Sequence, residues 1–190
     1  MKKLVIDKKK LRPLEPSKNP FASLVRSIIF QQLSGKAASS ILKKFIKLWS
    51  RKKFPTPSDV LVLTDEQFRS AGVSSQKANY LRDLAQKFLD KTIDPTRFPA
   101  MKDEEIIEHV VQVKGVGEWT AHMFLMFALN RPDVLPTGDL AIKKGFMKAF
   151  GLRKMPTHER MVALAKPYRG ERTYLSLYLW EILEDNDGGW

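Results

Sequence analysis

Cysteine is absent from the 190 residues of the chain. This absence excludes disulfides, thiolate zinc sites, cysteine-ligated iron–sulfur clusters and cysteine nucleophiles. Histidine is scarce, and His109, His122 and His158 show no metal-ligand spacing with one another or with carboxylates. The sequence also contains no P-loop, no dinucleotide fingerprint and no nucleophile elbow. The chemistry of the chain must therefore be sought in other residue types.

Long hydrophobic runs are missing as well. The longest clean apolar run, residues 123–129, is far shorter than the ~20 residues that span a bilayer. The first five residues show no extended apolar segment and no small-residue cleavage site, so we expect no secretory signal. We expect a soluble protein without membrane contact, cytoplasmic in a bacterium or archaeon and nuclear in a eukaryote.

Positive charge, in contrast, is in excess. The chain carries 33 basic and 21 acidic residues, which gives a formal net charge of +12. Such an excess favours a polyanionic partner, and nucleic acid is the common one. Lysines that are merely solvated explain the same charge, so the charge alone does not decide.

Helix signals recur along almost the whole chain, and no segment shows sustained period-two alternation with hairpin turns. Asn19 and Pro20 begin a helix, Thr64 and Gln67 form a capping box, and Gly151 follows a helix end. The expected helices cover residues 21–32, 37–49, 56–63, 64–72, 75–88, 102–111, 119–129, 139–150, 157–165 and 172–183. We predict an all-α fold of about nine or ten short helices.

The loop over residues 130–138 contains two prolines and is the best junction between two helical lobes. We treat residues 1–190 as a single all-α unit with one lobe over residues 20–131. The second lobe comprises residues 132–190 together with residues 1–19, and it carries Asp139. A cleft is expected between the lobes.

Two glycines, Gly115 and Gly117, lie between two expected helices and form a helix-hairpin-helix at about residues 103–129. Glycine tolerates the backbone angles of a tight hairpin and allows close approach to a phosphate. The amides at the start of the following helix favour an anion, and Lys114 adds a positive charge. The motif indicates a phosphate-binding corner; an ordinary helix corner with glycines for packing is the alternative.

Asp139 opens another expected helix, directly after Thr137 and Gly138. An aspartate at this position is an ordinary N-cap. The helix dipole and nearby amides also keep such a carboxylate ionised, which suits a group facing a developing cationic sugar. Cap and catalyst are therefore compatible roles.

Two tryptophans and the residues at the end of the first expected helix each allow a structural and a functional interpretation. Trp119 and Trp180 are core residues by default, or they are flat walls for an extruded base. Residues 31–35 end the first helix, and their side chains either complete an amphipathic helix or fill the gap left by a flipped nucleotide.

Four ordered segments make the chain resemble the helix-hairpin-helix (HhH-GPD) DNA glycosylases, most closely their 3-methyladenine (alkylbase) branch. These segments are residues 21–34, 113–121, 135–140 and 172–180, and the resemblance covers roughly residues 20–183. It implies two helical lobes that flank a cleft, and a monofunctional enzyme of base excision repair. Such an enzyme flips an alkylated purine, such as 3-methyladenine or 7-methylguanine, out of double-stranded DNA and hydrolyses its N-glycosidic bond. We expect a monomer that needs no redox cofactor or catalytic divalent metal.

The resemblance also implies roles for individual residues. Asp139 matches the catalytic aspartate, and the base pocket is formed by Trp119, Trp180 and Met123. The DNA-binding residues are Gln32, Leu33, Ser34, Lys114, Gly115, Val116, Gly117 and Thr120, with Leu33 as the intercalating wedge. Family members hold a monovalent cation, Na⁺ or K⁺, through carbonyls that here belong to Val111, Val113 and Val116.

Trp119 bears on the subclass. Bifunctional relatives carry a lysine at this position that forms a Schiff base with the sugar, and tryptophan cannot do so. We therefore predict no efficient strand cleavage. The signature here reads Thr137-Gly138-Asp139 in place of Gly-Pro-Asp or Gly-Val-Asp, and the chain has no room for the N-terminal β-rich domain of some relatives. Two alternatives stay open: a non-catalytic helix-hairpin-helix protein that binds DNA structure, and a bifunctional oxidised-base or mismatch glycosylase.

Overall fold

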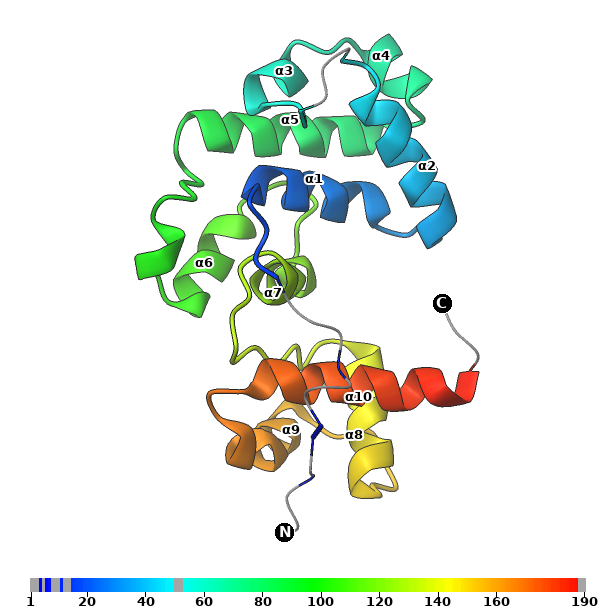
Figure 1. Ribbon diagram of the computed structural model, residues 1–190, viewed down its shortest axis with the longest axis vertical. Coiled ribbons are helices and arrows are strands. Elements are labelled where there is room, and N and C mark those ends of the chain that lie inside the picture. Colours follow the sequence, from blue (N-terminus) through cyan, green and yellow to red (C-terminus); the bar gives the residue numbers. More distant parts are fainter. Residues whose placement is uncertain (1–3, 5, 8–10, 12–14, 50–52, 188–190) are drawn as a thin grey trace. The chain divides into compact units, whose positions relative to one another are not determined.

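All regular structure in the described part of the chain is helical. The computed structural model describes residues 4, 6, 7, 11, 15–49 and 53–187, without the side chains of residues 184–187. Within these residues it contains ten α-helices, two 3-10 helices and no strand (Figure 1). The prediction of an all-α fold is therefore confirmed. Among the same residues, no helix combines the length and the apolar character that a membrane span requires.

The chain divides into two compact units. The hairpin unit comprises residues 17–124, and the aspartate unit comprises residues 1–16 and 125–190. The division falls inside helix α7 (Glu118–Phe127), whereas the sequence placed it in the proline-containing loop that follows. The cleft expected from the sequence stays a prediction.

Local sequence signals start and stop the helices of the hairpin unit. These helices are α1 (Pro20–Phe30), α2 (Gly35–Ile46), α3 (Pro57–Leu61), α4 (Asp65–Ser70), α5 (Ser75–Leu89), η1 (Phe98–Ala100), α6 (Asp103–Val110) and the start of α7. The Asn19 side chain accepts the Ala22 amide at 3.0 Å, as its N-cap position predicts. Thr64 and Gln67 form the predicted capping box, with Thr64 N donating to Gln67 Oε1 at 2.9 Å.

Helix α5 is the centre of the hairpin unit, and it packs against α1, α3 and α4 (Figure 1). Leu24 and Ile28 of α1 and Leu81 and Leu84 of α5 have no exposed surface. Burying each such side chain stabilises the fold by roughly 1.5–3 kcal/mol. This packing fixes α5 in place, so that α5 can support the hairpin, which contacts it through Tyr80 and Asp83.

In the aspartate unit, α8 (Leu140–Phe150) crosses α10 (Arg172–Asp187), and α9 (His158–Ala165) with η2 (Lys166–Tyr168) completes the core. The crossing point is Gly145, where an added Cβ would lie 2.5 Å from the carbonyl oxygen of Leu179. Only glycine allows this approach. Because Asp139 caps α8 and Trp180 follows Leu179 on α10, the crossing also decides how closely Asp139 and Trp180 approach each other.

Candidate active site and DNA-binding elements

Asp139 combines the two roles that its sequence position permits. It is the N-cap of α8, and its Oδ1 accepts the Ile142 amide at 2.8 Å and the Trp180 indole N–H at 3.3 Å. The residue is half-buried. Donors aimed at one carboxylate oxygen, together with the helix N-terminus, stabilise negative charge there. The structure thus joins two of the predicted site residues, 41 positions apart, through one hydrogen bond.

A second aromatic ring accompanies Trp180. The ring of Phe127 stacks on the indole with a centroid distance of 6.1 Å and an interplanar angle of 21°. Phe127 remains 41% exposed although it belongs to the longest apolar run of the sequence. Phe127 was not among the residues predicted from the sequence, although the four-residue steps from Trp119 to Met123 and from Met123 to Phe127 could have indicated it.

An ion pair with α10 secures the start of the loop that leads to Asp139. Arg172 Nε and Nη2 donate to the Asp133 carboxylate at 2.6 and 2.8 Å. Burial raises the pKa of Asp133, but the hydrogen bonds and charge of Arg172 outweigh burial and hold the pKa below its usual value. The pair therefore stays ionised at neutral pH and fixes the loop to the first turn of α10.

Two buried hydroxyl groups on the same helix hold the next part of the loop. Thr173 and Ser176 have no exposed surface. Thr173 Oγ1 donates to the Arg131 carbonyl at 2.6 Å and accepts the Val134 amide at 3.0 Å, while Ser176 Oγ lies 3.1 Å from the Val134 carbonyl oxygen. Residues 172, 173, 176 and 180 of α10 therefore contact the loop from its beginning to Asp139.

Close to the carboxylate, Thr137 is joined to α9. Its Oγ1 lies 2.8 Å from His158 Nδ1, and the Asp139 amide donates to the Pro136 carbonyl at 3.0 Å. The signature tripeptide is thus tied on both sides, which limits the freedom of the carboxylate.

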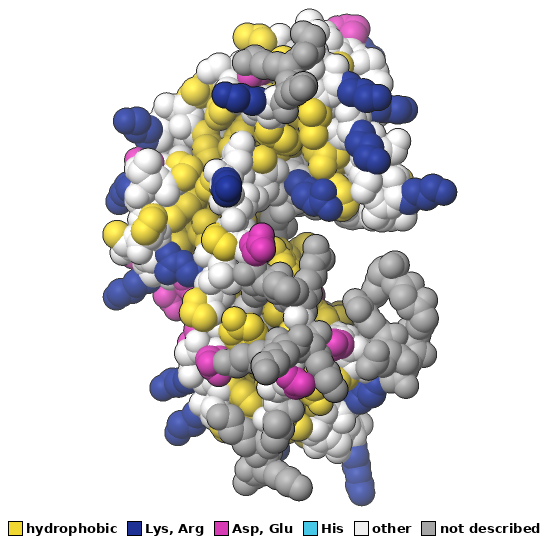
Figure 2. Space-filling view, in the orientation of Figure 1, with side chains coloured by type: hydrophobic (Ala, Val, Ile, Leu, Met, Phe, Trp, Pro, Cys, Tyr) yellow, Lys and Arg dark blue, Asp and Glu magenta, His cyan; other side chains and the backbone are white. Residues whose placement is uncertain are grey.

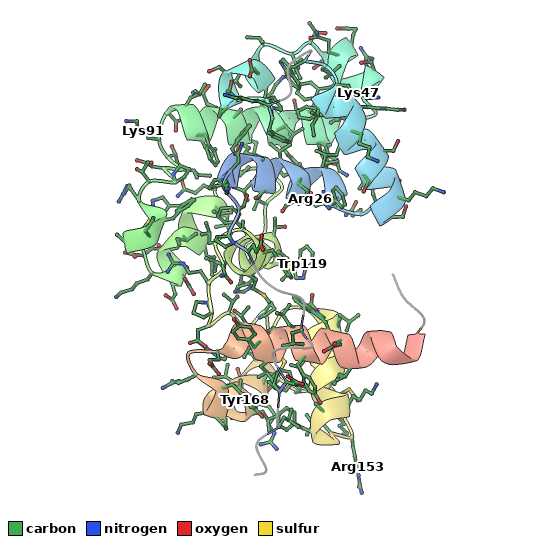
Figure 3. The ribbon with its side chains drawn as sticks, in the orientation of Figure 1. Arg26, Lys47, Lys91, Trp119, Arg153 and Tyr168 are labelled. Atoms are coloured by element: carbon green, nitrogen blue, oxygen red, sulfur yellow. The ribbon has the colours of Figure 1, made fainter. Side chains whose placement is uncertain are left out.

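Trp119 and Met123 come from α7 in the hairpin unit. Trp119 lies in the first turn, is 51% exposed and projects outward from the helix (Figure 3). A large aromatic ring held at the surface is typical of a contact site rather than a core position. Met123 is half-buried, whereas Thr120, one residue after Trp119, is only 4% exposed.

The two hairpin glycines serve different purposes. Gly115 has φ +75°, and an added Cβ would lie 2.1 Å from the ring of Tyr80, so its missing side chain makes room for that ring. Gly117 is exposed with nothing within 4 Å of its Cβ position, and it therefore allows close approach from outside. The sequence favoured close approach for both glycines, with packing as the alternative, and Gly115 matches that alternative.

Two hairpin amides already have acceptors within the protein. Lys114 N donates to Asp83 Oδ2 at 2.8 Å, and Val116 N donates to the Val113 carbonyl at 3.0 Å. Asp83 is in turn paired with Lys87 Nζ at 3.0 Å. Tyr80 and Asp83 support the hairpin but were not predicted from the sequence, because no local pattern links α5 to a hairpin 31 residues away.

We name residues 31–34, between α1 and α2, the tip. Leu33 is 40% exposed, and Gln32 has φ +55°, in the left-handed region that residues other than glycine rarely adopt. Ser34 caps α2 by accepting the Ala37 amide at 3.3 Å. Lys36, Lys43 and Lys44 of α2 and its C-cap Lys47 are exposed, and Figure 2 shows basic side chains along this helix.

The carbonyls predicted to hold a cation lie at a helix C-terminus. Val111 is the C-cap of α6, and Val113 and Val116 form the turn that follows. The Val111 carbonyl lies at the negative end of the helix dipole, which favours a cation, whereas the Val113 carbonyl already accepts the Val116 amide at 3.0 Å.

Comparison with known proteins agrees with this geometry. The model of the HhH-GPD superfamily of base excision DNA repair proteins matches residues 25–169. DNA-3-methyladenine glycosylase 1 of Schizosaccharomyces pombe is 35% identical over 181 residues, which cover 94% of this chain and 78% of that protein.

Solved structures give the same result. The S. pombe 3-methyladenine DNA glycosylase in complex with abasic DNA matches with a TM-score of 0.78 and 33% identity, over 90% of this chain and 85% of that one. DNA-3-methyladenine glycosidase from Bacillus halodurans matches with a TM-score of 0.82 and 35% identity, over 90% of this chain and 78% of that chain.

The chain therefore belongs to the HhH-GPD superfamily of base excision DNA repair proteins. The resemblance to helix-hairpin-helix glycosylases that the four sequence segments carry is confirmed.

Proposed function

We propose that this protein is a DNA-3-methyladenine glycosylase that removes alkylated purines, such as 3-methyladenine and 7-methylguanine, from double-stranded DNA. The single observation that carries the proposal is the Asp139 carboxylate, capped by Ile142 and bonded to the Trp180 indole. The names of the S. pombe and B. halodurans relatives support the same substrate class.

The reaction uses the charge that alkylation places on the base. Methylation at N3 or N7 makes the purine cationic and a good leaving group. The electron pair of the bond between C1′ and the base nitrogen leaves with the base, and the sugar gains oxocarbenium character. The Asp139 carboxylate stabilises this positive sugar and orients the water whose oxygen forms the new bond to C1′, and that water releases one proton to the solvent as the bond forms.

Aromatic rings supply selectivity for the cationic base. The electron-rich face of an indole or phenyl ring attracts a cation by ~0.5–2 kcal/mol. We assign this role to Trp180 and Phe127, which stack at 6.1 Å, and on the family resemblance to Trp119, with Met123 as a further residue of the base pocket. Position 119 offers no amine for a Schiff base, so we propose a monofunctional enzyme without lyase activity.

The hairpin unit supplies the contacts to the DNA backbone. We assign phosphate contacts to the exposed Gly117 amide and to Lys114, and insertion into the duplex to Leu33 at the tip, flanked by Gln32 and Ser34. A contact from Thr120 stays a prediction that its burial does not favour. The carbonyls of Val111, Val113 and Val116 would hold Na⁺ or K⁺, which supplies positive charge beside the phosphate. We further propose that the protein acts as a monomer.

Replacement of Asp139 by Asn tests the catalytic assignment. Asparagine retains an oxygen that accepts the Ile142 amide and the Trp180 indole, so fold and cap are preserved. We expect release of 3-methyladenine from methylated duplex DNA to fall by about 10²–10³-fold, the usual effect of removing one preorganised electrostatic group. Binding of undamaged duplex should not change.

Asp94→Asn is the matched control, because Asp94 is not among the residues assigned to the site and its carboxylate bonds only locally, to Thr96. Near-normal base release by Asp139→Asn would refute the role of Asp139. No base release by the wild-type protein, with duplex binding intact, would favour a non-catalytic DNA-structure binder. Borohydride trapping of a covalent DNA complex would instead indicate a bifunctional glycosylase.

A further inference from the structure

The tip and the hairpin are joined by a direct hydrogen bond. Gln31 Nε2 donates to the Gly115 carbonyl at 2.9 Å, across a separation of 84 residues. Both groups belong to the hairpin unit. The bond therefore connects the loop that carries Leu33 with the turn that is proposed to bind a phosphate.

Lys77 of α5 anchors the same part of the tip. Its ammonium group donates to the carbonyls of Ile29 at 2.7 Å and Gln31 at 2.8 Å, at the end of α1. Carbonyls at a helix C-terminus lack intrahelical donors, and a cation is the favoured partner there. The Lys77 side chain is partly buried against the protein, and this burial lowers the pKa of its ammonium group from the usual value.

The hairpin rests on the same face of α5. The Tyr80 ring occupies the space at Gly115, and Asp83 accepts the Lys114 amide at 2.8 Å. Residues 77, 80 and 83 follow one another at three-residue steps, so they share one side of the helix. Helix α5 thus holds the tip through Lys77 and the hairpin through Tyr80 and Asp83.

The backbone of the tip is in an unfavourable conformation that its neighbours maintain. Gln32 has φ +55°, and such a residue persists only where the surrounding structure determines its shape. The preceding residue, Gln31, is fixed both by its side chain and by its carbonyl. The shape of the tip is therefore set by contacts within the free protein.

We propose that Gln31 and Lys77 are positioning residues that lock the tip to the hairpin, so that backbone binding and insertion of Leu33 occur as one rigid event. This inference rests on the proposed function. Its physical benefit is that the favourable free energy of phosphate binding acts directly on the unstacking of the target base, because no loop has to be ordered first.

A double-mutant cycle with Gln31→Met and Leu33→Ala tests the proposal. Methionine preserves the length of the side chain but cannot donate to the Gly115 carbonyl. Base extrusion is measured by the fluorescence of 2-aminopurine placed beside an abasic analogue, and duplex binding by anisotropy on undamaged DNA. We expect Gln31→Met to reduce extrusion about 10-fold in the presence of Leu33 and to have no further effect once Leu33 is alanine.

Further variants separate positioning from general damage. Gln86→Met, at an exposed position of α5, is the matched control and should extrude normally. Lys77→Met should reproduce the defect of Gln31→Met, and Lys77→Arg should restore extrusion because arginine can still donate to both carbonyls. Affinity for undamaged duplex should stay within about threefold throughout.

Two results would overturn the proposal: additive effects of Gln31→Met and Leu33→Ala, or a loss of undamaged-duplex affinity as large as the loss of extrusion. These outcomes are distinguishable from a failure of the proposed function, which would show as no release of alkylated base by the wild-type protein.

Discussion

Gly145→Ala should damage the site from a distance, through the crossing of α8 and α10. The new Cβ would lie 2.5 Å from the Leu179 carbonyl oxygen and 2.8 Å from the Leu179 Cβ, whereas ordinary contact begins at 3.4 Å. The two helices must therefore move apart by about 0.9 Å. Neither atom is the end of a flexible side chain, so the strain cannot be relieved by a rotamer change.

The stability change contains two opposing terms. Overpacking of a core contact costs about 1–3 kcal/mol, while replacing a glycine inside a helix by alanine gains about 0.5–1 kcal/mol. We expect a net loss of about 1 kcal/mol, which lowers the melting temperature by about 2–4 °C in a chain of this size. Thermal melts of the two proteins measure this change.

The effect on activity should exceed the effect on stability. The Trp180–Asp139 hydrogen bond is already 3.3 Å long, and a shift of this size would take it beyond hydrogen-bond distance. Bonds to charged groups contribute about 1.5–3 kcal/mol, so we expect release of 3-methyladenine under single-turnover conditions to fall about 10–100-fold.

Gly35→Ala is the control, because Gly35 is also a helical glycine, at the first position of α2, but nothing lies within 4 Å of its Cβ position. It should leave base release unchanged and preserve or raise the melting temperature. If Gly145→Ala instead melted at or above the wild-type temperature with normal base release, the argument that close packing of α8 and α10 sets the position of Asp139 would be wrong.

Three further variants probe the aspartate and hairpin units. Trp180→Phe keeps an aromatic ring to stack on Phe127 but removes the indole donor to Asp139, so base release should fall about 10-fold with little change in melting; an unchanged rate would show that the indole bond is dispensable. Asp133→Asn weakens the pair with Arg172, and because both side chains are more than a quarter exposed we expect a loss of only about 1–2 kcal/mol in urea unfolding. Burial lowers the pKa of His122 below 6.5 despite the opposing charges of Glu118 and Asp103. Between the folded pKa and about 6.5, the unfolded chain therefore binds more protons than the folded chain, so the free energy of unfolding should decrease as pH falls through this range. His122→Gln should flatten this decrease in thermal melts between pH 5 and 7.

Helix positions were largely predictable because their signals are local. The N-cap at Asn19, the capping box of Thr64 and Gln67, and the left-handed Gly151 after α8 act within a few residues, and each appears where the sequence indicates. The same holds for Asp139, whose capping role needs only the residues that follow it. The backbone of Gln32 could not be predicted in this way. No neighbouring residue indicates its left-handed conformation, because that conformation depends on hydrogen bonds from α5 and to the hairpin.

The helical class, the hairpin with its two glycines and the acid at the start of α8 can all be predicted from the sequence, because periodicity, caps and short motifs report on neighbouring residues. Which groups surround that acid and which groups hold the hairpin depends on tertiary packing. Trp180 reaches Asp139 across 41 residues, Asp83 reaches the hairpin across 31, and Gly145 acquires its importance from a carbonyl on another helix. Such contacts arise from the packing of distant segments into one volume, and no local pattern encodes which segments will meet.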